Sequence, residues 1–279
     1  MNQPHISTHS STHSSNSFHT ITARRFAGLD RLYGEGAAQK LSQAHVCVVG
    51  VGGVGSWAVE ALARCGVGEL TLIDADHVVE SNVNRQIQAT ELTFGKAKIT
   101  ALKERIGLIN PDCIVHEVDD FIDEDNLNLM PASAQVILDC ADQVRAKYAM
   151  LLEARQRRQP LLCCGAAGGK QDATRIVQCD LSQSIQDPIL AKIRSRLRSH
   201  LKQSGANLGK KSATTVAKLG VPVLFSDEAV RYPEAVCDVG DAAPQGLNCA
   251  GFGSSVMVTA SFGMAAAQWA VGHILREKK

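Results

Sequence analysis

Short apolar runs alternate with longer mixed segments along the first part of the chain. Five runs are rich in Val, Leu, Ile and Cys, as is typical of buried strands: 45–50, 69–76, 114–120, 134–142 and 160–166. Segments of helical length lie between most of them, at 54–65, 96–109 and 143–158. Strands that alternate with helices predict an α/β fold with a Rossmann-like, doubly wound and mostly parallel sheet.

The second part of the chain departs from this regular alternation. Residues 175–181 and 221–226 predict further strands, and residues 188–203 predict a helix followed by a flexible loop at 204–214. Residues 233–250 contain Pro and Gly without a hydrophobic period, which indicates a crossover loop. Residues 251–275 are apolar but rich in small residues, which favours a buried C-terminal helix over membrane insertion.

Composition and net charge limit the classes of protein to which the chain can belong. The 279 residues carry a net charge of +1, so any attraction to nucleic acid must be local. The nine cysteines form no C-x-x-C pair, so a zinc ribbon has no support, and the free thiols suit a reducing, cytoplasmic setting. Residues 1–20 are rich in Ser, Thr and His, lack the basic start and apolar run of a secretory signal, and predict a disordered tail.

A glycine-rich turn follows the first predicted strand. The motif G-x-G-x-x-G, with one extra glycine, consists of Gly50, Gly52, Gly53 and Gly55. Small residues allow close approach of a phosphate, and the N-terminus of the next helix supplies free N–H groups. Asp74 ends the second predicted strand, where a carboxylate can accept from ribose hydroxyls. This unit predicts a nucleotide site, with NAD as the default ligand.

Charged residues after successive strands change that prediction. The stretches that carry them are Asp74-Ala75-Asp76, Ser81 to Gln86, Gly95 to Lys98 and Asp139 to Asp142. Hydride transfer needs an apolar slot for the nicotinamide, whereas cations and carboxylates stabilise charge on phosphates and hold Mg²⁺. The set therefore favours chemistry on ATP itself over an NAD-dependent oxidoreductase.

The combination GVGGVGS, LIDAD, SNVNRQ, GKAK and DCAD resembles the ubiquitin-activating-enzyme-like adenylating superfamily, which includes the bacterial sulfur-carrier adenylyltransferases. The resemblance implies that a substrate carboxylate attacks the α-phosphate of ATP to form an acyl-adenylate. It also implies roles for individual residues: the four glycines, Asp74 and Asp76 in ATP binding, Asn82, Arg85 and Lys98 on its phosphates, Asp142 on Mg²⁺, and Arg31 in the site of a homodimer partner.

Residues 24–275 resemble one family in particular, the bacterial tRNA threonylcarbamoyladenosine dehydratases. The resemblance rests on ARRFAGLDRLYGEGA, DDFI, the long AAGGKQDATRIVQCDLSQSIQDPILAKIRSRLR stretch, FSDEAVRYP and NCAGFGSSVMVTASFG. It implies ATP-driven cyclisation of threonylcarbamoyladenosine in tRNA with loss of water. It further implies a single adenylating domain at 21–279, with a nucleotide-binding half at 21–166 and a half for tRNA and the crossover loop at 167–279.

A local basic cluster agrees with an RNA partner. The segment 188–226 holds eight basic residues and no acid before Asp227, and seven of them are candidate tRNA contacts: Lys192, Arg194, Arg196, Arg198, Lys202, Lys210 and Lys211. A solvated helix face is the alternative interpretation.

Cys237 lies in the predicted crossover loop, where it could act as a thiol nucleophile or as a sulfur acceptor from a cysteine desulfurase. Its acidic neighbours favour a cysteine without a catalytic role.

Two other functions stay open at this point. The chain could activate the C-terminal glycine of a ubiquitin-like sulfur-carrier protein, although the zinc cysteines common in those enzymes are missing. It could also be a catalytically silent, nucleotide-dependent scaffold, against which the intact set of Arg85, Lys98 and Asp142 argues.

Overall fold

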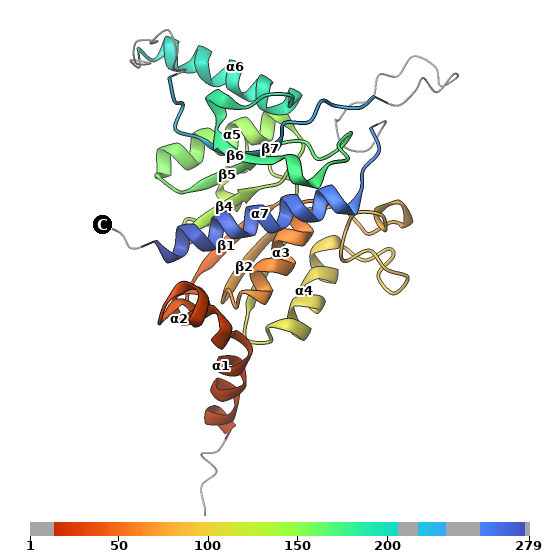
Figure 1. Cartoon of the computed structure of the whole chain (residues 1–279), viewed down its shortest axis with the longest axis vertical. Coiled ribbons are helices and arrows are strands. Elements are labelled where there is room, and N and C mark those ends of the chain that lie inside the picture. Colours follow the sequence, from red (N-terminus) through yellow and green to blue (C-terminus); the bar gives the residue numbers. More distant parts are fainter. Residues whose placement is uncertain (1–13, 206–216, 233–251, 277–279) are drawn as a thin grey trace, which may run out of the picture.

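A seven-stranded sheet with the order β3-β2-β1-β4-β5-β7-β6 forms the centre of the molecule (Figure 1). The computed structural model describes residues 14–205, 217–232 and 252–276. Neighbouring strands pair in parallel, except that β6 is antiparallel to β7. The strands are β1 (His45–Val49), β2 (Glu69–Ile73), β3 (Ile114–Val118), β4 (Val136–Asp139), β5 (Leu161–Cys164), β6 (Ile176–Asp180) and β7 (Pro222–Ser226).

Helices cover both faces of the sheet. They are α1 (Ser14–Tyr33), α2 (Ala37–Ser42), α3 (Gly55–Arg64), α4 (Lys98–Ile109), α5 (Val144–Arg157), α6 (Pro188–Gln203) and α7 (Val256–Leu275), with short 3₁₀ turns at Glu80–Asn82, Leu127–Leu129, Ala173–Arg175 and Leu181–Gln183. The predicted doubly wound, mostly parallel sheet is confirmed, together with the C-terminal strands and helix. The predicted crossover loop at 233–250 lies outside the described residues.

Successive residues of the central strands point into two separate cores. On β1, Val46 and Val48 face a cluster built with α3, α4 and α7, whereas Cys47 and Val49 face a cluster built with α5 and α6. All four of these side chains are buried. Burial on both faces explains why the strands read as continuous apolar runs rather than as an alternating pattern.

Helix α7 crosses the sheet beside α3 (Figure 1). A Cβ on Gly263 would lie 2.6 Å from the carbonyl oxygen of Val54, so the two helices approach closely there. The prediction of a buried helix holds for one face only, because Met257 and Met264 are exposed on the other. Within the described ranges, no helix is long and apolar enough to cross a membrane.

The N-terminal region differs from its prediction. Residues 14–20, expected to belong to a tail, lie in α1, and residues 1–13 lie outside the described residues. The later part of α1 is anchored, because Phe26 packs under Gly66 and the Arg25 guanidinium donates to the carbonyl oxygen of Ile109 (2.9 Å). Helix α1 therefore begins before the predicted end of the tail at residue 20, and it projects from the body of the molecule (Figure 1).

The order of the strands defines where a ligand can bind. Strand β1 lies between β2 and β4, so the connections after β1 and β4 lead to opposite faces of the sheet. In such sheets a crevice opens at the carboxyl ends of the two strands. The glycine-rich turn after β1 and the Asp139–Asp142 turn after β4 lie at this point.

Candidate nucleotide site

The glycine turn after β1 requires small residues for different reasons at different positions. Gly50 has a φ of 80°, and a Cβ there would lie 2.9 Å from the backbone of Cys140 and Ala141. A Cβ on Gly55 would lie only 1.9 Å from the carbonyl oxygen of Gly50, so this glycine allows α3 to start directly against the strand. Around Gly52 the nearest atom to such a Cβ is 3.9 Å away, which leaves that position open to a ligand.

The structure brings most of the predicted site residues to one pocket at this crevice. Its lining includes eight of them: Gly50, Gly52, Gly53, Asp74, Asp76, Arg85, Lys98 and Asp142. Three others do not line it. Gly55 packs within the turn, Asn82 accepts from the backbone N–H of Val79 (3.3 Å), and Arg31 is exposed in the last turn of α1.

Two carboxylates at the end of β2 have different tasks. The buried Asp74 accepts hydrogen bonds from the backbone N–H groups of Val51 (2.8 Å) and Asp76 (2.9 Å), so it fixes the glycine turn. Burial raises the pKa of its carboxyl group. Asp76 is more exposed and pairs with the buried Lys98, whose Nζ lies 2.6 Å from Oδ2. The ion pair aims the lysine at the pocket.

Arg85 belongs to a segment that is fixed from both sides. Its backbone carbonyl accepts from the indole N–H of Trp57 (3.0 Å) and from the hydroxyl of Thr259 (3.1 Å). Its guanidinium donates to the carbonyl of Ser81 (2.5 Å) and to the side chain of Asn84 (3.0 Å). Helices α3 and α7 therefore hold the backbone, and local acceptors hold the charge, at the edge of the pocket.

A buried ion pair supports the opposite wall. Lys147 of α5 and Asp139 at the end of β4 are both fully buried, with Nζ and Oδ1 2.8 Å apart. The lysine also donates to the backbone carbonyl of Asp139 (3.1 Å). Burial alone would lower the pKa of Lys147, but the Asp139 carboxylate outweighs it and raises that pKa. The charged pair fixes the turn that carries Asp142.

Cysteines cluster between the two central strands at the base of the pocket. The Sγ atoms of Cys140 and Cys164 are 3.9 Å apart, and both residues contribute to the lining. The seven cysteines in the described part of the chain are free thiols. Burial raises the pKa of Cys47 to about 12 and also raises the pKa of Cys163, so both are protonated packing residues.

The sequence did not single out several residues that the fold adds to the site. Gln86 and Thr259 line the pocket, as do Asp120, Phe121 and Ile122 after β3. The NRQ stretch offered a signal for Gln86, because it directly follows Arg85. Thr259 comes from α7, 174 positions away in sequence from the Arg85 carbonyl that it contacts, and only the fold reveals it.

The pocket offers few carboxylates for the predicted Mg²⁺. No group of three or more His, Cys, Asp or Glu side chains gathers in the part of the chain that the structure describes. Mg²⁺ commonly uses one or two carboxylates together with substrate phosphates and water. Asp142 is a half-buried carboxylate in the pocket lining, whereas Asp139 is committed to Lys147. A single ligand from Asp142 fits a metal that arrives with a nucleotide.

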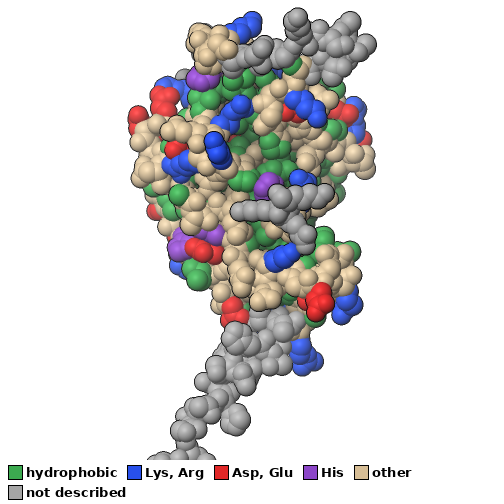
Figure 2. Space-filling model, turned by 90° about the vertical axis from the view of Figure 1, so that its left-hand side faces the viewer, with side chains coloured by type: hydrophobic (Ala, Val, Ile, Leu, Met, Phe, Trp, Pro, Cys, Tyr) green, Lys and Arg blue, Asp and Glu red, His purple; other side chains and the backbone are tan. Residues whose placement is uncertain are grey.

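The predicted RNA-contact residues are only partly on a free surface. On α6, Lys192, Arg196 and Lys202 are exposed, and Figure 2 shows basic side chains at the end of the molecule where α6 lies. Arg198 is half-buried, and Arg194 is tied to the carbonyl and the hydroxyl of Ser184. Lys210, Lys211 and Cys237 lie outside the described residues.

The sheet order, the glycine turn and the charged pocket define a nucleotide-binding α/β protein of the doubly wound class. Residues 23–278 match the ThiF family, and the chain belongs to that family. The glycine turn and the cations of Arg85 and Lys98 line the same pocket.

Two curated relatives match nearly the whole chain. The tRNA threonylcarbamoyladenosine dehydratase of Escherichia coli K12 is 46% identical over 261 residues, covering 91% of this chain and 93% of the relative. The enzyme of the same name from Haemophilus influenzae is 39% identical over 257 residues, covering 91% and 95%. The crystal structure of the E. coli tRNA N6-threonylcarbamoyladenosine dehydratase in complex with ATP matches with a TM-score of 0.77 and 43% identity, covering 90% of this chain and 94% of that chain.

Proposed function

We propose that this protein is an ATP-dependent tRNA threonylcarbamoyladenosine dehydratase. The observation that carries the proposal is the placement of Arg85, Lys98 and Asp142 in the pocket, within a chain that aligns over nine-tenths of its length with relatives of that name. A molybdopterin-synthase adenylyltransferase from Salmonella typhimurium matches only 46% of the chain, at 35% identity. This difference in coverage favours the dehydratase over activation of a sulfur-carrier protein.

The proposed reaction has two steps. The carboxylate of the threonyl group attacks the α-phosphate of ATP, forming an acyl-adenylate and releasing pyrophosphate. A nitrogen of the same side chain then attacks the acyl carbon and expels AMP, which closes a ring; the net change in the nucleoside is the loss of one water. The nucleophile is already tethered beside the acyl group, so proximity replaces a protein nucleophile.

The residues of the pocket divide this work. The backbone around Gly52 faces the phosphates, Lys98 and Arg85 stabilise the charge that develops on the α-phosphate, and Asp74 holds the turn in place. Asp142 would hold Mg²⁺, which neutralises phosphate charge when it is bound. Arg31 would act in the pocket of a second copy in a homodimer, since it lies outside its own pocket on a projecting helix with Leu32 exposed beside it.

The direct test measures AMP release by the purified protein with Mg·ATP and tRNA that carries the modified adenosine. We expect AMP and pyrophosphate in equal amounts, with the nucleoside losing the mass of one water. Unmodified tRNA and a sulfur-carrier protein ending in Gly-Gly serve as controls. AMP release with the carrier protein but not with modified tRNA would contradict the proposal.

The exposed basic face of α6 is the proposed tRNA contact. The double variant Lys192→Glu/Arg196→Glu should weaken tRNA binding and reduce the salt dependence of binding, by about one unit of slope per lost phosphate contact. The control Lys40→Glu/Arg158→Glu reverses two exposed basic residues elsewhere. Equal tRNA affinity of the two variants would reject this face. Cys237 lies outside the described residues, so its role in the crossover loop stays a prediction. A sulfur-relay partner also stays a prediction.

A further inference from the structure

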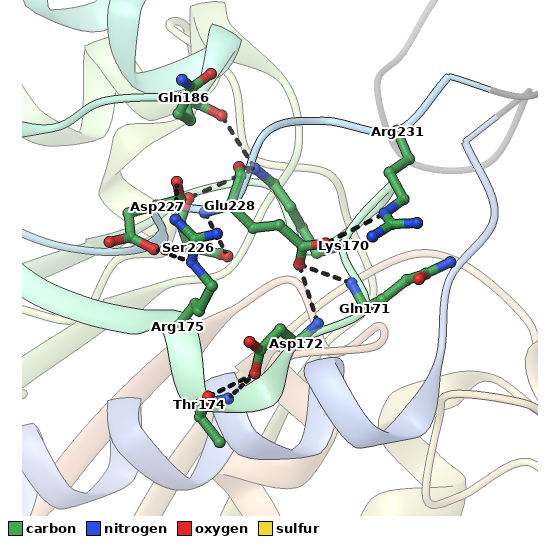
Figure 3. A network of polar contacts seen from close by, with 10 residues as sticks. All are labelled: Lys170, Gln171, Asp172, Thr174, Arg175, Gln186, Ser226, Asp227, Glu228 and Arg231. Carbon is green, nitrogen blue, oxygen red and sulfur yellow. Dashed lines mark hydrogen bonds and ion pairs between the residues drawn. The ribbon is translucent and has the colours of Figure 1, made fainter.

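Lys170 is a buried lysine in the loop that follows β5. Only 3% of its surface is exposed. Its ammonium group donates to three backbone carbonyl oxygens: those of Gln186 (3.1 Å), Ser226 (3.5 Å) and Glu228 (Figure 3). Burial lowers the pKa of this ammonium group, whereas the nearby carboxylates of Asp187 and Glu228, which are not among its hydrogen-bond partners, favour its charged form. The group thus lies in a cradle of carbonyl dipoles.

The cradle joins segments that are far apart in the sequence. Gln186 has a φ of 53° in the turn before α6, and Ser226 ends β7. Glu228 makes the connection reciprocal, because its carboxylate accepts from the backbone N–H groups of Gln171 and Asp172, at 2.9 Å each (Figure 3). One charged side chain from each segment therefore fixes the backbone of the other.

The same loop is a wall of the nucleotide pocket. Gly165, Ala167 and Gly168 line the pocket, and the backbone N–H of Ala166 donates to the carboxylate of Asp187 (2.8 Å), directly after Gln186. Beside Lys170, the N–H of Gly169 donates to the carbonyl of Gly253 (3.0 Å), and its own carbonyl accepts from Arg231 (2.9 Å). The position of the pocket wall thus depends on the cradle around Lys170.

A buried ammonium among carbonyl oxygens is chemically equivalent to a bound monovalent cation. K⁺ and NH₄⁺ have similar sizes, and backbone carbonyls can replace the water around such ions. We propose that Lys170 is a positioning residue that acts as a covalently tethered monovalent cation and holds the 165–168 wall of the pocket in place. A lysine that merely fills space would need no charge at this position, and that difference can be tested.

The test compares the wild-type protein with Lys170→Ala and Lys170→Met in the chlorides of choline, Li⁺, K⁺ and NH₄⁺. In choline, Lys170→Ala should show a lower Tm and a KM for ATP raised by about tenfold, because buried carbonyls lose their partner. K⁺ and NH₄⁺ should restore both values, whereas Li⁺ should not. Lys170→Met fills the space with an apolar chain and should not respond to any ion. The wild-type protein and the exposed-lysine control Lys40→Ala should respond to the choice of salt in the same way as each other, without the K⁺- and NH₄⁺-specific recovery expected of Lys170→Ala.

Each outcome decides the proposal. It is wrong if Lys170→Ala matches the wild type in choline, if K⁺ and NH₄⁺ restore neither Tm nor KM, or if the variant fails to fold even in K⁺. The KM measurement rests on the proposed function, but the Tm measurement uses no substrate, so salt-specific recovery of Tm supports the cation role even where AMP is never released.

Discussion

The Asp139–Lys147 pair supports a strong prediction about stability. Both side chains are fully buried, and their charged atoms are 2.8 Å apart. Asp139→Asn leaves the buried ammonium of Lys147 without its counter-charge. Lys147→Met leaves the buried carboxylate of Asp139 without its counter-charge. Removing one partner of a buried pair costs about 3–5 kcal/mol. At roughly 2–4 °C per kcal/mol for a domain of this size, each single variant should lower Tm by about 6–20 °C.

The double variant Asp139→Asn/Lys147→Met gives the decisive comparison. Replacing both members of a buried pair by neutral groups of similar volume is often neutral for stability. The double variant should therefore be more stable than either single variant, with a coupling energy of at least about 3 kcal/mol. Equilibrium unfolding in urea for all four proteins measures this coupling. If the double variant loses the sum of the two single losses, the two groups do not act as a pair.

The remaining predictions address the pocket and the response to pH. Gly55→Ala should lower Tm, because the added Cβ meets the Gly50 carbonyl at 1.9 Å, whereas Gly52→Ala should keep Tm and weaken ATP binding measured by calorimetry. Equal Tm losses in both would contradict this assignment. Lys98→Ala should reduce the rate of AMP release by roughly 10²–10³, and near-normal turnover would remove Lys98 from the site. Burial depresses the pKa of His45 below its usual 6.5, so the folded state favours the neutral ring, and stability falls as the pH drops from that value through the folded-state pKa. A Tm–pH profile should show this loss for the wild type but not for His45→Gln, and parallel profiles would refute it.

The sequence predicted the fold best where the signals were local. The β1–α3–β2 unit follows from an apolar run, four glycines and a strand that ends at Asp74, all within 30 neighbouring positions. The extents of α5 and α6 were also close to those predicted. The antiparallel direction of β6 was not predicted, because it depends on pairing with β7 more than 40 residues later.

Within the site, residues were missed where two distant segments meet. Lys147 reads as an ordinary surface charge of an amphipathic helix, and only its packing against β4 reveals that it is buried. Lys170 looked like a loop lysine, since nothing in its neighbourhood in the sequence indicates three carbonyls from residues 186–228. Asn82 is the converse case, a residue that the sequence predicted for the site but that does not line the pocket. It matches the expected motif, yet its side chain caps its own turn.

The two pocket cations share a physical arrangement that bears on catalysis. Lys98 is buried and held by Asp76, whose side chain is 53% exposed, and the guanidinium of Arg85 is held by acceptors in its own turn. A fully solvated cationic side chain would have to lose its hydration and its rotamer freedom when a phosphate binds. Here the protein has already ordered both groups, so in the proposed reaction an incoming phosphate would meet charges that are in place, and little reorganisation would accompany the reaction.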